Sequence, residues 1–184
     1  HLALCALGII KGQEVIVPSL TFVASVNVIK YLNSDPIFMD VDSSHNLDVK
    51  KTVAFLKKNT FKKNKSTYNK KTKKKISAII IAHMWGNALE FNDLVKICKE
   101  MNIYIIEDAA EALGTYYLSG PNKKKHVGTI GDIGCISFNG NKIITTGSGG
   151  ALLVKKKSLQ KKILYLAEQA KNDSIKYIHN EVGF

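Results

Sequence analysis

The segment Ile103–Gly114, with the sequence IYIIEDAAEALG, indicates the fold class of the chain. Its first four residues, Ile103–Ile106, are apolar or aromatic, as in a strand that is buried on both faces, and two acidic residues follow them. The preceding segment Phe91–Met101 has apolar residues at helical spacing, and the apolar run Ile76–Ala82 comes before it. A helix between two buried strands is typical of a parallel sheet, so this region predicts an α/β fold.

The alternation of apolar strands and amphipathic helices extends along the chain in both directions. It predicts a mostly parallel sheet between helices in a single domain, with ligands bound beyond the carboxyl ends of the strands. The expected strands are Glu14–Val17, Pro36–Val41, Ile76–Ala82, Ile103–Ile106, Ile133–Phe138 and Ala151–Val154. The expected helices are His1–Leu7, Phe22–Leu32, one capped by Asp48 that runs to about Lys58, Phe91–Met101 and Ser158–Ala170.

The charge of the chain raises the possibility of a nucleic-acid partner. All 27 basic residues are lysines, they face 15 acidic residues, and ten of them lie between Lys57 and Lys75. Lysine lacks the planar fork that reads guanine or grips phosphate, and this stretch offers only Phe61 and Tyr68 for base stacking. We therefore interpret the stretch as a solvated loop, with non-specific polyanion binding as the alternative.

Other classes of protein are excluded by composition. A hydrophobic fraction of 45% excludes a disordered chain, and the apolar run Ile76–Ala82 is far too short to span a membrane. Cys5, Cys98 and Cys135 are odd in number and widely spaced, which predicts free thiols in a reducing cytoplasm. His83 has no second histidine or acidic residue at metal-ligand spacing, so we expect a core or loop histidine.

Asp108 is the first candidate for chemistry, because it ends a strand on the side where ligands bind. A second interpretation is structural. Asp108 and Glu111 have the spacing of a capping box, which would make Asp108 the N-cap of a helix. The spacing alone leaves both interpretations open.

Lys142 is the second candidate. It lies in the segment Ser137–Gly150, SFNGNKIITTGSGG, where a strand ends in a loop of small polar residues. A desolvated lysine there can form a Schiff base, whereas a solvated surface lysine is the plainer interpretation. A phosphate-binding P-loop is excluded, because Ile143 follows the lysine where a serine or threonine is required. Ser137 lacks the glycine pattern of a hydrolase nucleophile, but its hydroxyl could bind phosphate.

Six segments, taken in order, resemble the sugar-nucleotide aminotransferases of the DegT/StrS family. They read EVIVPSLTFVAS, PIFMDVD, AHMWGN, IEDAAEALGTYY, GTIGDIGCISFNGNKIITTGSGG and HNEVGF, and the resemblance covers nearly the whole chain. The resemblance implies a pyridoxal-phosphate transferase of fold type I. It is strongest to the branch that makes bacillosamine- or legionaminic-type 4-amino sugars.

The resemblance also implies roles for individual residues. Lys142 matches the lysine that holds pyridoxal 5′-phosphate covalently, and Asp108 matches the acid that pairs with the pyridinium nitrogen. Phe22 matches the aromatic residue stacked on the cofactor ring, and Ser137 matches a phosphate-binding hydroxyl. Glu111 falls where many relatives have glutamine or histidine near the phenolic oxygen, which a carboxylate there would repel.

For the chain as a whole, the resemblance implies that residues 1–184 form the cofactor-binding large domain, incomplete at both ends and without the small C-terminal domain. The lysine-rich stretch at about 57–75 would be a family insertion. The expected protein is a cytoplasmic homodimer with shared active sites, with no nucleic-acid or membrane partner.

The implied reaction moves an amino group from glutamate to the C4 keto group of a nucleotide-linked 4-keto-6-deoxy sugar of the UDP-N-acetyl-bacillosamine type, in cell-surface glycan biosynthesis. A sugar dehydratase of the same family is one alternative, but those relatives replace the cofactor lysine with histidine, and Lys142 argues against it. A basic, non-catalytic binding or regulatory homologue is another.

Overall fold

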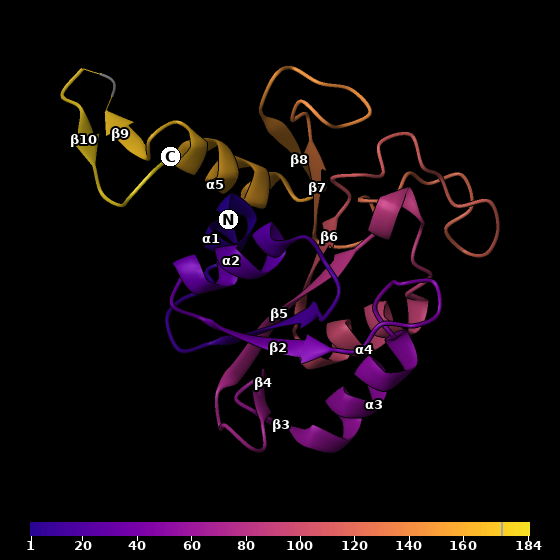
Figure 1. Cartoon of the computed structure of the whole chain (residues 1–184). Helices are drawn as coiled ribbons and strands as arrows, with labels where there is room; N and C mark the ends of the chain where they lie inside the picture. Colours follow the sequence, from indigo (N-terminus) through magenta and orange to yellow (C-terminus); the bar gives the residue numbers. More distant parts are fainter. Residues whose placement is uncertain (174) are drawn as a thin grey trace.

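The computed structural model describes residues 1–173 and 175–184 and has an eight-stranded sheet at its centre (Figure 1). Neighbouring strands from β2 to β7 run parallel, and β8 is antiparallel to β7. The mostly parallel sheet predicted from the sequence is therefore confirmed. In spatial order the strands of this path are β2 (Asp35–Met39), β1 (Glu14–Pro18), β5 (Lys75–Ala82), β6 (Tyr104–Asp108), β7 (Ile133–Ser137) and β8 (Gly150–Val154).

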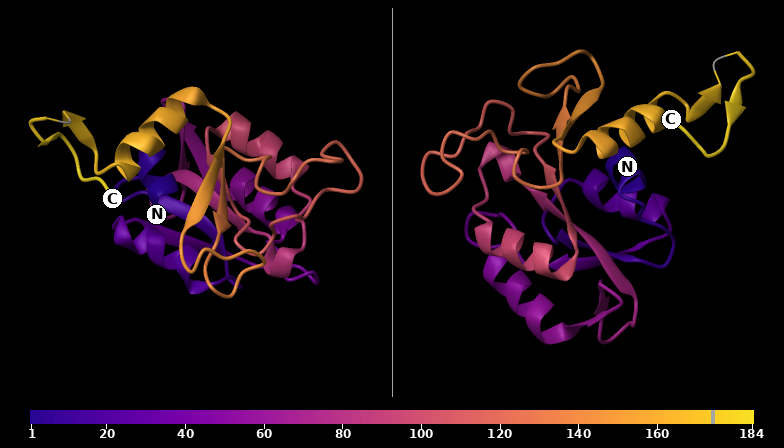
Figure 2. Two further views of the ribbon diagram at one scale, coloured as in Figure 1. Left: turned by 90° about the horizontal axis from the view of Figure 1, so that it is seen from above. Right: turned by 180° about the vertical axis from the view of Figure 1, so that it is seen from behind.

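Helices cover both faces of this sheet, as Figure 2 shows from two sides. Alternate strand residues point to opposite faces, so an apolar strand supplies two separate clusters. Val15 and Val17 share one buried cluster with Ile29, whereas Ile16 shares the other with Leu94. The first face carries α1 (Leu2–Ala6), α2 (Val23–Tyr31) and α5 (Lys157–Ala167), and the second carries α3 (Val49–Asn59) and α4 (Asn92–Met101).

The helix boundaries follow local chemistry. Asp48 caps α3 as expected, because its Oδ1 accepts a hydrogen bond from the backbone N–H of Lys51 at 2.9 Å. The last helix ends at Ala167, three residues earlier than predicted, and Gln169 and Ala170 then take positive φ angles. A small antiparallel pair that the sequence analysis did not predict follows, made of β9 (Lys171–Asp173) and β10 (Ile178–His179).

The prediction of a loop at the lysine-rich stretch was wrong. The stretch contains an antiparallel hairpin, β3 (Thr60–Lys63) and β4 (Ser66–Asn69), and β4 pairs with the start of β5. Positive φ angles at Asn64 and Lys65 fit the tight turn that joins two twisted strands. Thr67 and Asn69 are buried, so alternation hides one face of the hairpin while its lysines point to solvent.

Among the described residues, no helix is long and apolar enough to cross a membrane. All three cysteines are free thiols, as expected. Burial raises the pKa of the Cys98 and Cys135 thiols to about 12, so both stay protonated at neutral pH.

Candidate functional site

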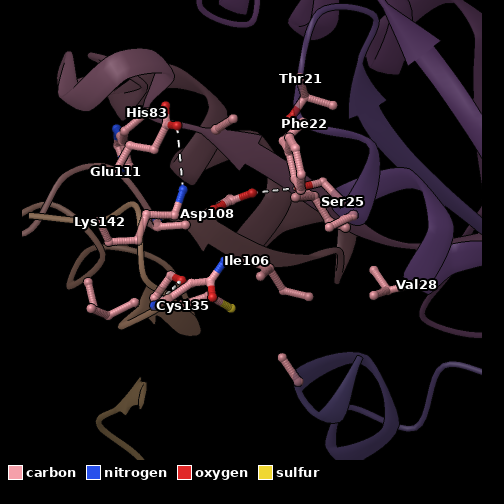
Figure 3. A pocket seen from close by; sticks show the side chains of 18 of the residues that line it. Thr21, Phe22, Ser25, Val28, His83, Ile106, Asp108, Glu111, Cys135 and Lys142 are labelled. Atoms are coloured by element: carbon pink, nitrogen blue, oxygen red, sulfur yellow. Dashed lines mark hydrogen bonds and ion pairs between the residues drawn. The ribbon is translucent and has the colours of Figure 1, made fainter. Parts of the chain in front are cut away.

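A cavity of about 580 Å³ opens beyond the carboxyl ends of the parallel strands (Figure 3). Strands β5, β6 and β7 end at its floor, and the segment after β1 forms one wall. This is the edge where ligands bind in such sheets. The five residues selected from the sequence all line this one cavity: Phe22, Asp108, Glu111, Ser137 and Lys142. Segments more than 100 residues apart thus meet there.

Asp108 is the last residue of β6, and both of its carboxylate oxygens accept hydrogen bonds. Oδ1 accepts from the backbone N–H of Ala110 at 3.1 Å, and Oδ2 accepts from the hydroxyl of Ser25 at 2.5 Å. Residues 109–114 form turns in place of a helix, so Asp108 is not a helix N-cap. Its bond to Ala110 is a local turn contact, and the capping-box interpretation is overturned.

Lys142 lies in the loop between β7 and β8 and points toward the cavity (Figure 3). Its Nζ lies 3.5 Å from Oε1 of Glu111, and its side chain is only 16% exposed. The other oxygen of Glu111, Oε2, accepts the backbone N–H of Trp85 at 3.1 Å. The carboxylate of Glu111 is therefore held between a cation and a backbone donor, which limits the free negative charge that it presents to the cavity.

Phe22 and Ser137 complete the predicted set on two other walls. Phe22 is the N-cap residue of α2, and 73% of it is exposed. Such exposure of a large aromatic residue beside a cavity leaves a ring face free for a ligand. Ser137 ends β7, and its Oγ accepts a weak bond from the backbone N–H of Asn139 at 3.3 Å, so its proton is free to be donated.

His83 follows β5 and is a buried, satisfied histidine, as expected from the sequence. Its Nδ1 accepts the backbone N–H of Leu89 at 3.1 Å, so the proton of the neutral ring is assigned to Nε2, which donates to Oε2 of Glu107 at 3.0 Å. Glu107 also accepts backbone N–H groups from the segment 128–131. Burial alone would raise the pKa of Glu107, but these hydrogen bonds hold it below its usual value.

The short 3-10 helix η1 (Met84–Gly86) forms part of the rim of the cavity. Trp85 has left-handed backbone angles (φ 52°, ψ 29°) and is 62% exposed. At Gly86, φ is 82°, and an added Cβ would lie 2.9 Å from the backbone oxygen of Glu111. Glycine is therefore required at this position, where the rim passes close to the Glu111 segment.

Sequence reasoning missed several residues of the site. Ser25 and Thr21 line the cavity from the α2 segment, and Thr21 Oγ1 is buried without a hydrogen-bond partner among the described residues. Glu107 was noted only as one of two acidic residues in a row. Strand alternation was the available signal, because it directs Glu107 and Asp108 to opposite faces of β6.

Comparison with known proteins identifies relatives over the whole chain. The model of the DegT/DnrJ/EryC1/StrS aminotransferase family matches residues 1–184. GDP-perosamine synthase of Escherichia coli O157:H7 is 40% identical over 184 residues, which are 100% of this chain and 45% of that protein. A UDP-4-amino-4,6-dideoxy-N-acetyl-beta-L-altrosamine transaminase of Campylobacter jejuni is 36% identical over 90% of this chain and 39% of its own length.

Solved structures of this aminotransferase family have the same fold as this chain. A DegT/DnrJ/EryC1/StrS aminotransferase from Brucella abortus superposes with a TM-score of 0.81 at 26% identity, over 100% of this chain and 46% of that one. The chain thus spans less than half the length of the relatives that it matches. The predicted transferase fold is confirmed by this likeness.

Proposed function

This chain belongs to the DegT/DnrJ/EryC1/StrS aminotransferase family, and we propose that it forms the cofactor-binding part of a sugar aminotransferase. Aminotransferases of this family use pyridoxal 5′-phosphate. The proposed reaction transfers an amino group from glutamate to the C4 keto group of a nucleotide-linked 4-keto-6-deoxy sugar. The observation that carries the proposal is the meeting of Lys142 and Asp108, a primary amine and a carboxylate from distant segments, in one cavity.

The donor set of the cavity fits this cofactor. The cofactor has an aldehyde, a pyridine nitrogen, a phosphate and a flat ring. The cavity offers the amine of Lys142 for the aldehyde and the carboxylate of Asp108 for the nitrogen. The hydroxyls of Ser137 and Thr21 are available for oxygen atoms, and Thr21 Oγ1 is buried with no partner within the described residues. A buried hydroxyl without a partner is costly, which supports a ligand contact there.

Lys142 would hold the cofactor through its Nζ in the resting protein and would transfer a proton during the reaction. When bound, pyridoxal 5′-phosphate supplies an electron sink for the negative charge that develops at the substrate carbon. Nζ of Lys142 would act as the base that takes the proton from the α-carbon of glutamate, and it would later deliver a proton to C4 of the sugar. Its partial burial in the loop after β7 keeps this base within the cavity.

The other site residues orient the ring. Asp108 would pair with the pyridine nitrogen of the bound cofactor, and a carboxylate partner there would favour a protonated ring and thus a stronger electron sink. Phe22 would cover one face of the bound ring, and Ser137 would donate its hydroxyl to the phosphate. Glu111 lies beside Lys142, so its carboxylate forms an ion pair with the Lys142 ammonium in the absence of the cofactor.

The sugar acceptor is the finer part of the proposal. We propose a UDP-linked sugar of the N-acetyl-bacillosamine type as the first candidate, because the lysine-rich insertion and the segment around Lys142 resemble those of the enzymes that make such sugars. GDP-perosamine synthases match the entire chain at 36–40% identity, and their names support a GDP-linked acceptor as the second candidate. The two candidates differ in the nucleotide that carries the sugar, which is UDP in the first and GDP in the second.

We propose that the active protein is a homodimer that works in the cytoplasm. Phe22 and Trp85 expose large aromatic surfaces at the cavity, as expected where a second subunit completes the site. The free cysteines favour a reducing compartment.

The test uses the full-length protein that contains this chain. Borohydride reduction followed by peptide mapping should place the cofactor on Lys142. Glutamate alone should remove the visible absorbance of the bound cofactor, and nitrogen should then appear on a UDP- or GDP-linked 4-keto sugar. A label on Lys125 or Lys155 would contradict the role of Lys142. Consumption of the keto sugar without gain of nitrogen would identify a dehydratase.

A further inference from the structure

We propose that Ser25 is a positioning residue that holds Asp108 as an oriented carboxylate at the floor of the cavity. The inference rests on the proposed function, because it assigns a partner to the acid that would face the pyridine nitrogen. Ser25 lies in the first turn of α2, which comes 83 residues before Asp108 in the chain. Figure 3 shows the two side chains turned toward one another.

The geometry fixes the orientation of the carboxylate. Oδ2 accepts the Ser25 hydroxyl at 2.5 Å, and Oδ1 accepts the N–H of Ala110 at 3.1 Å. Ser25 is only 6% exposed, so water competes little for this bond. A donor on each oxygen prevents rotation of the carboxylate. Hydrogen bonds to a charged acceptor are short and strong.

The position of Ser25 on its helix adds a second effect. The N-cap of α2 is Phe22, whose side chain makes no capping hydrogen bond, so the first N–H groups of the helix are not satisfied by a side chain. The N-terminus of a helix carries a partial positive charge, which stabilises a nearby anion. Through Ser25, the first turn of α2 contacts the Asp108 carboxylate and places it close to this charge.

The same turn also carries Phe22. The residue that would cover the ring face and the residue that orients the acid therefore lie three positions apart on one rigid helix. A shift of α2 would move both together, so Ser25 links the placement of the aromatic ring to the placement of the carboxylate. This predicts that Ser25 affects cofactor binding through Asp108 and not through the general stability of α2.

A double-mutant cycle on the full-length protein tests this. The variants are Ser25→Ala, Asp108→Asn and the double variant, with Ser25→Thr as the variant that keeps the hydroxyl. Ser34→Ala is the matched control, because Ser34 is fully buried, donates to the backbone oxygen of Ile10 at 2.9 Å and lies outside the cavity. The readouts are the dissociation constant of pyridoxal 5′-phosphate and the rate at which glutamate bleaches the bound cofactor. Circular dichroism checks that each variant folds.

We expect Ser25→Ala to weaken cofactor binding or slow the bleaching by about tenfold to a hundredfold, the usual effect of losing a hydrogen bond to a charged group. In the Asp108→Asn background the same change should have an effect of less than about threefold, because the neutral amide leaves no charged group for Ser25 to orient. Ser25→Thr should keep most of the wild-type values, and Ser34→Ala should match wild type.

Three results would overturn the proposal. The first is a Ser25→Ala variant with wild-type binding and bleaching. The second is an equal effect of Ser25→Ala in both backgrounds, which would show that Ser25 acts independently of Asp108. The third is an Asp108→Asn variant with wild-type values, which would also remove Asp108 from the proposed function. The first two results would contradict only the role of Ser25 and would leave the proposed function unchanged. Failure of the Ser25 proposal can therefore be distinguished from failure of the proposed function.

Discussion

The Nε2 of His83 lies 3.0 Å from Oε2 of Glu107, and neither side chain is exposed. The pair joins the end of β5 to β6, and His83 is one of the residues that line the cavity. Glu107 also accepts three backbone N–H groups, from Gly128, Ile130 and Gly131. One buried carboxylate thus holds the loop before β7 against the strand that carries Asp108, which makes it a structural anchor of the site.

The first prediction concerns this anchor. Glu107→Ala should lower the free energy of unfolding by about 3 kcal/mol, because it leaves the buried N–H groups of His83 and Gly128 and the half-buried ones of Ile130 and Gly131 without an acceptor. Urea unfolding of the full-length protein measures this. Glu100→Ala is the control, since Glu100 is exposed and its loss should change stability by less than about 0.5 kcal/mol. Equal effects of the two variants would contradict the prediction.

The second prediction is the pH dependence of the same group. The pKa of Glu107 is lowered in the folded protein, so the folded state favours the ionised carboxylate. This contribution to stability is complete above the usual glutamate pKa of about 4.5 and is lost as the pH falls through the lower, folded value. Melting temperatures measured from pH 7 to pH 3 should therefore fall more steeply below pH 5 for wild type than for Glu107→Ala. Parallel curves would contradict this prediction.

Much of the fold follows from the sequence because the central strands of this sheet, such as β1 and β5, are buried on both faces. Mostly apolar runs such as Ile76–Ala82, in which Ser77 is the one polar residue, mark such strands, and the helices between them have clear apolar spacing. The lysine-rich hairpin was missed because its buried positions are Thr60, Thr67 and Asn69, which carry no apolar signal. Asn69 is buried because its side chain donates to Glu14 at 3.0 Å, a contact across 55 residues.

The residues of the site could be predicted from the sequence only in part. Residues at strand ends, such as Asp108 and Ser137, could be placed by topology alone, because the carboxyl ends of parallel strands share one edge. Ser25 could not, because it lies on a helix, and its role depends on a single contact with Asp108. The turns after Asp108 were mistaken for a possible helix start, since a capping-box pattern is local and cannot report that tertiary contacts hold the chain in turns.

The third prediction concerns Asp108. Asp108→Asn should preserve the fold, because asparagine has nearly the same shape and its amide oxygen can still accept from Ser25 or Ala110. It should lower the turnover of the full-length enzyme by orders of magnitude, because an uncharged amide no longer favours the protonated pyridine ring. Steady-state amino transfer from glutamate measures the loss. A nearly fully active variant would limit Asp108 to a structural role.

The fourth prediction is that the full-length protein sediments as a homodimer. Phe22 and Trp85 are 73% and 62% exposed at the cavity, and large exposed aromatic groups are typical of surfaces that a partner covers. Sedimentation velocity with and without pyridoxal 5′-phosphate measures the assembly. A monomer that binds the cofactor tightly would show that one chain completes the site.

The fifth prediction concerns Glu111, whose carboxylate lies 3.5 Å from Lys142 Nζ. Glu111→Gln should bind pyridoxal 5′-phosphate up to about fivefold more tightly, because it removes an ion pair that competes with the cofactor for Lys142 and a charge that repels the phenolic oxygen of the ring. The amide oxygen of glutamine can still accept the N–H of Trp85, so the rim should stay in place. Glu111→Ala is the comparison, because it removes both contacts and should disturb the rim and weaken binding. Equilibrium dialysis measures the affinities. If glutamine weakens binding as much as alanine does, the negative charge of Glu111 supports the cofactor, and its pairing with Lys142 is not a competing contact.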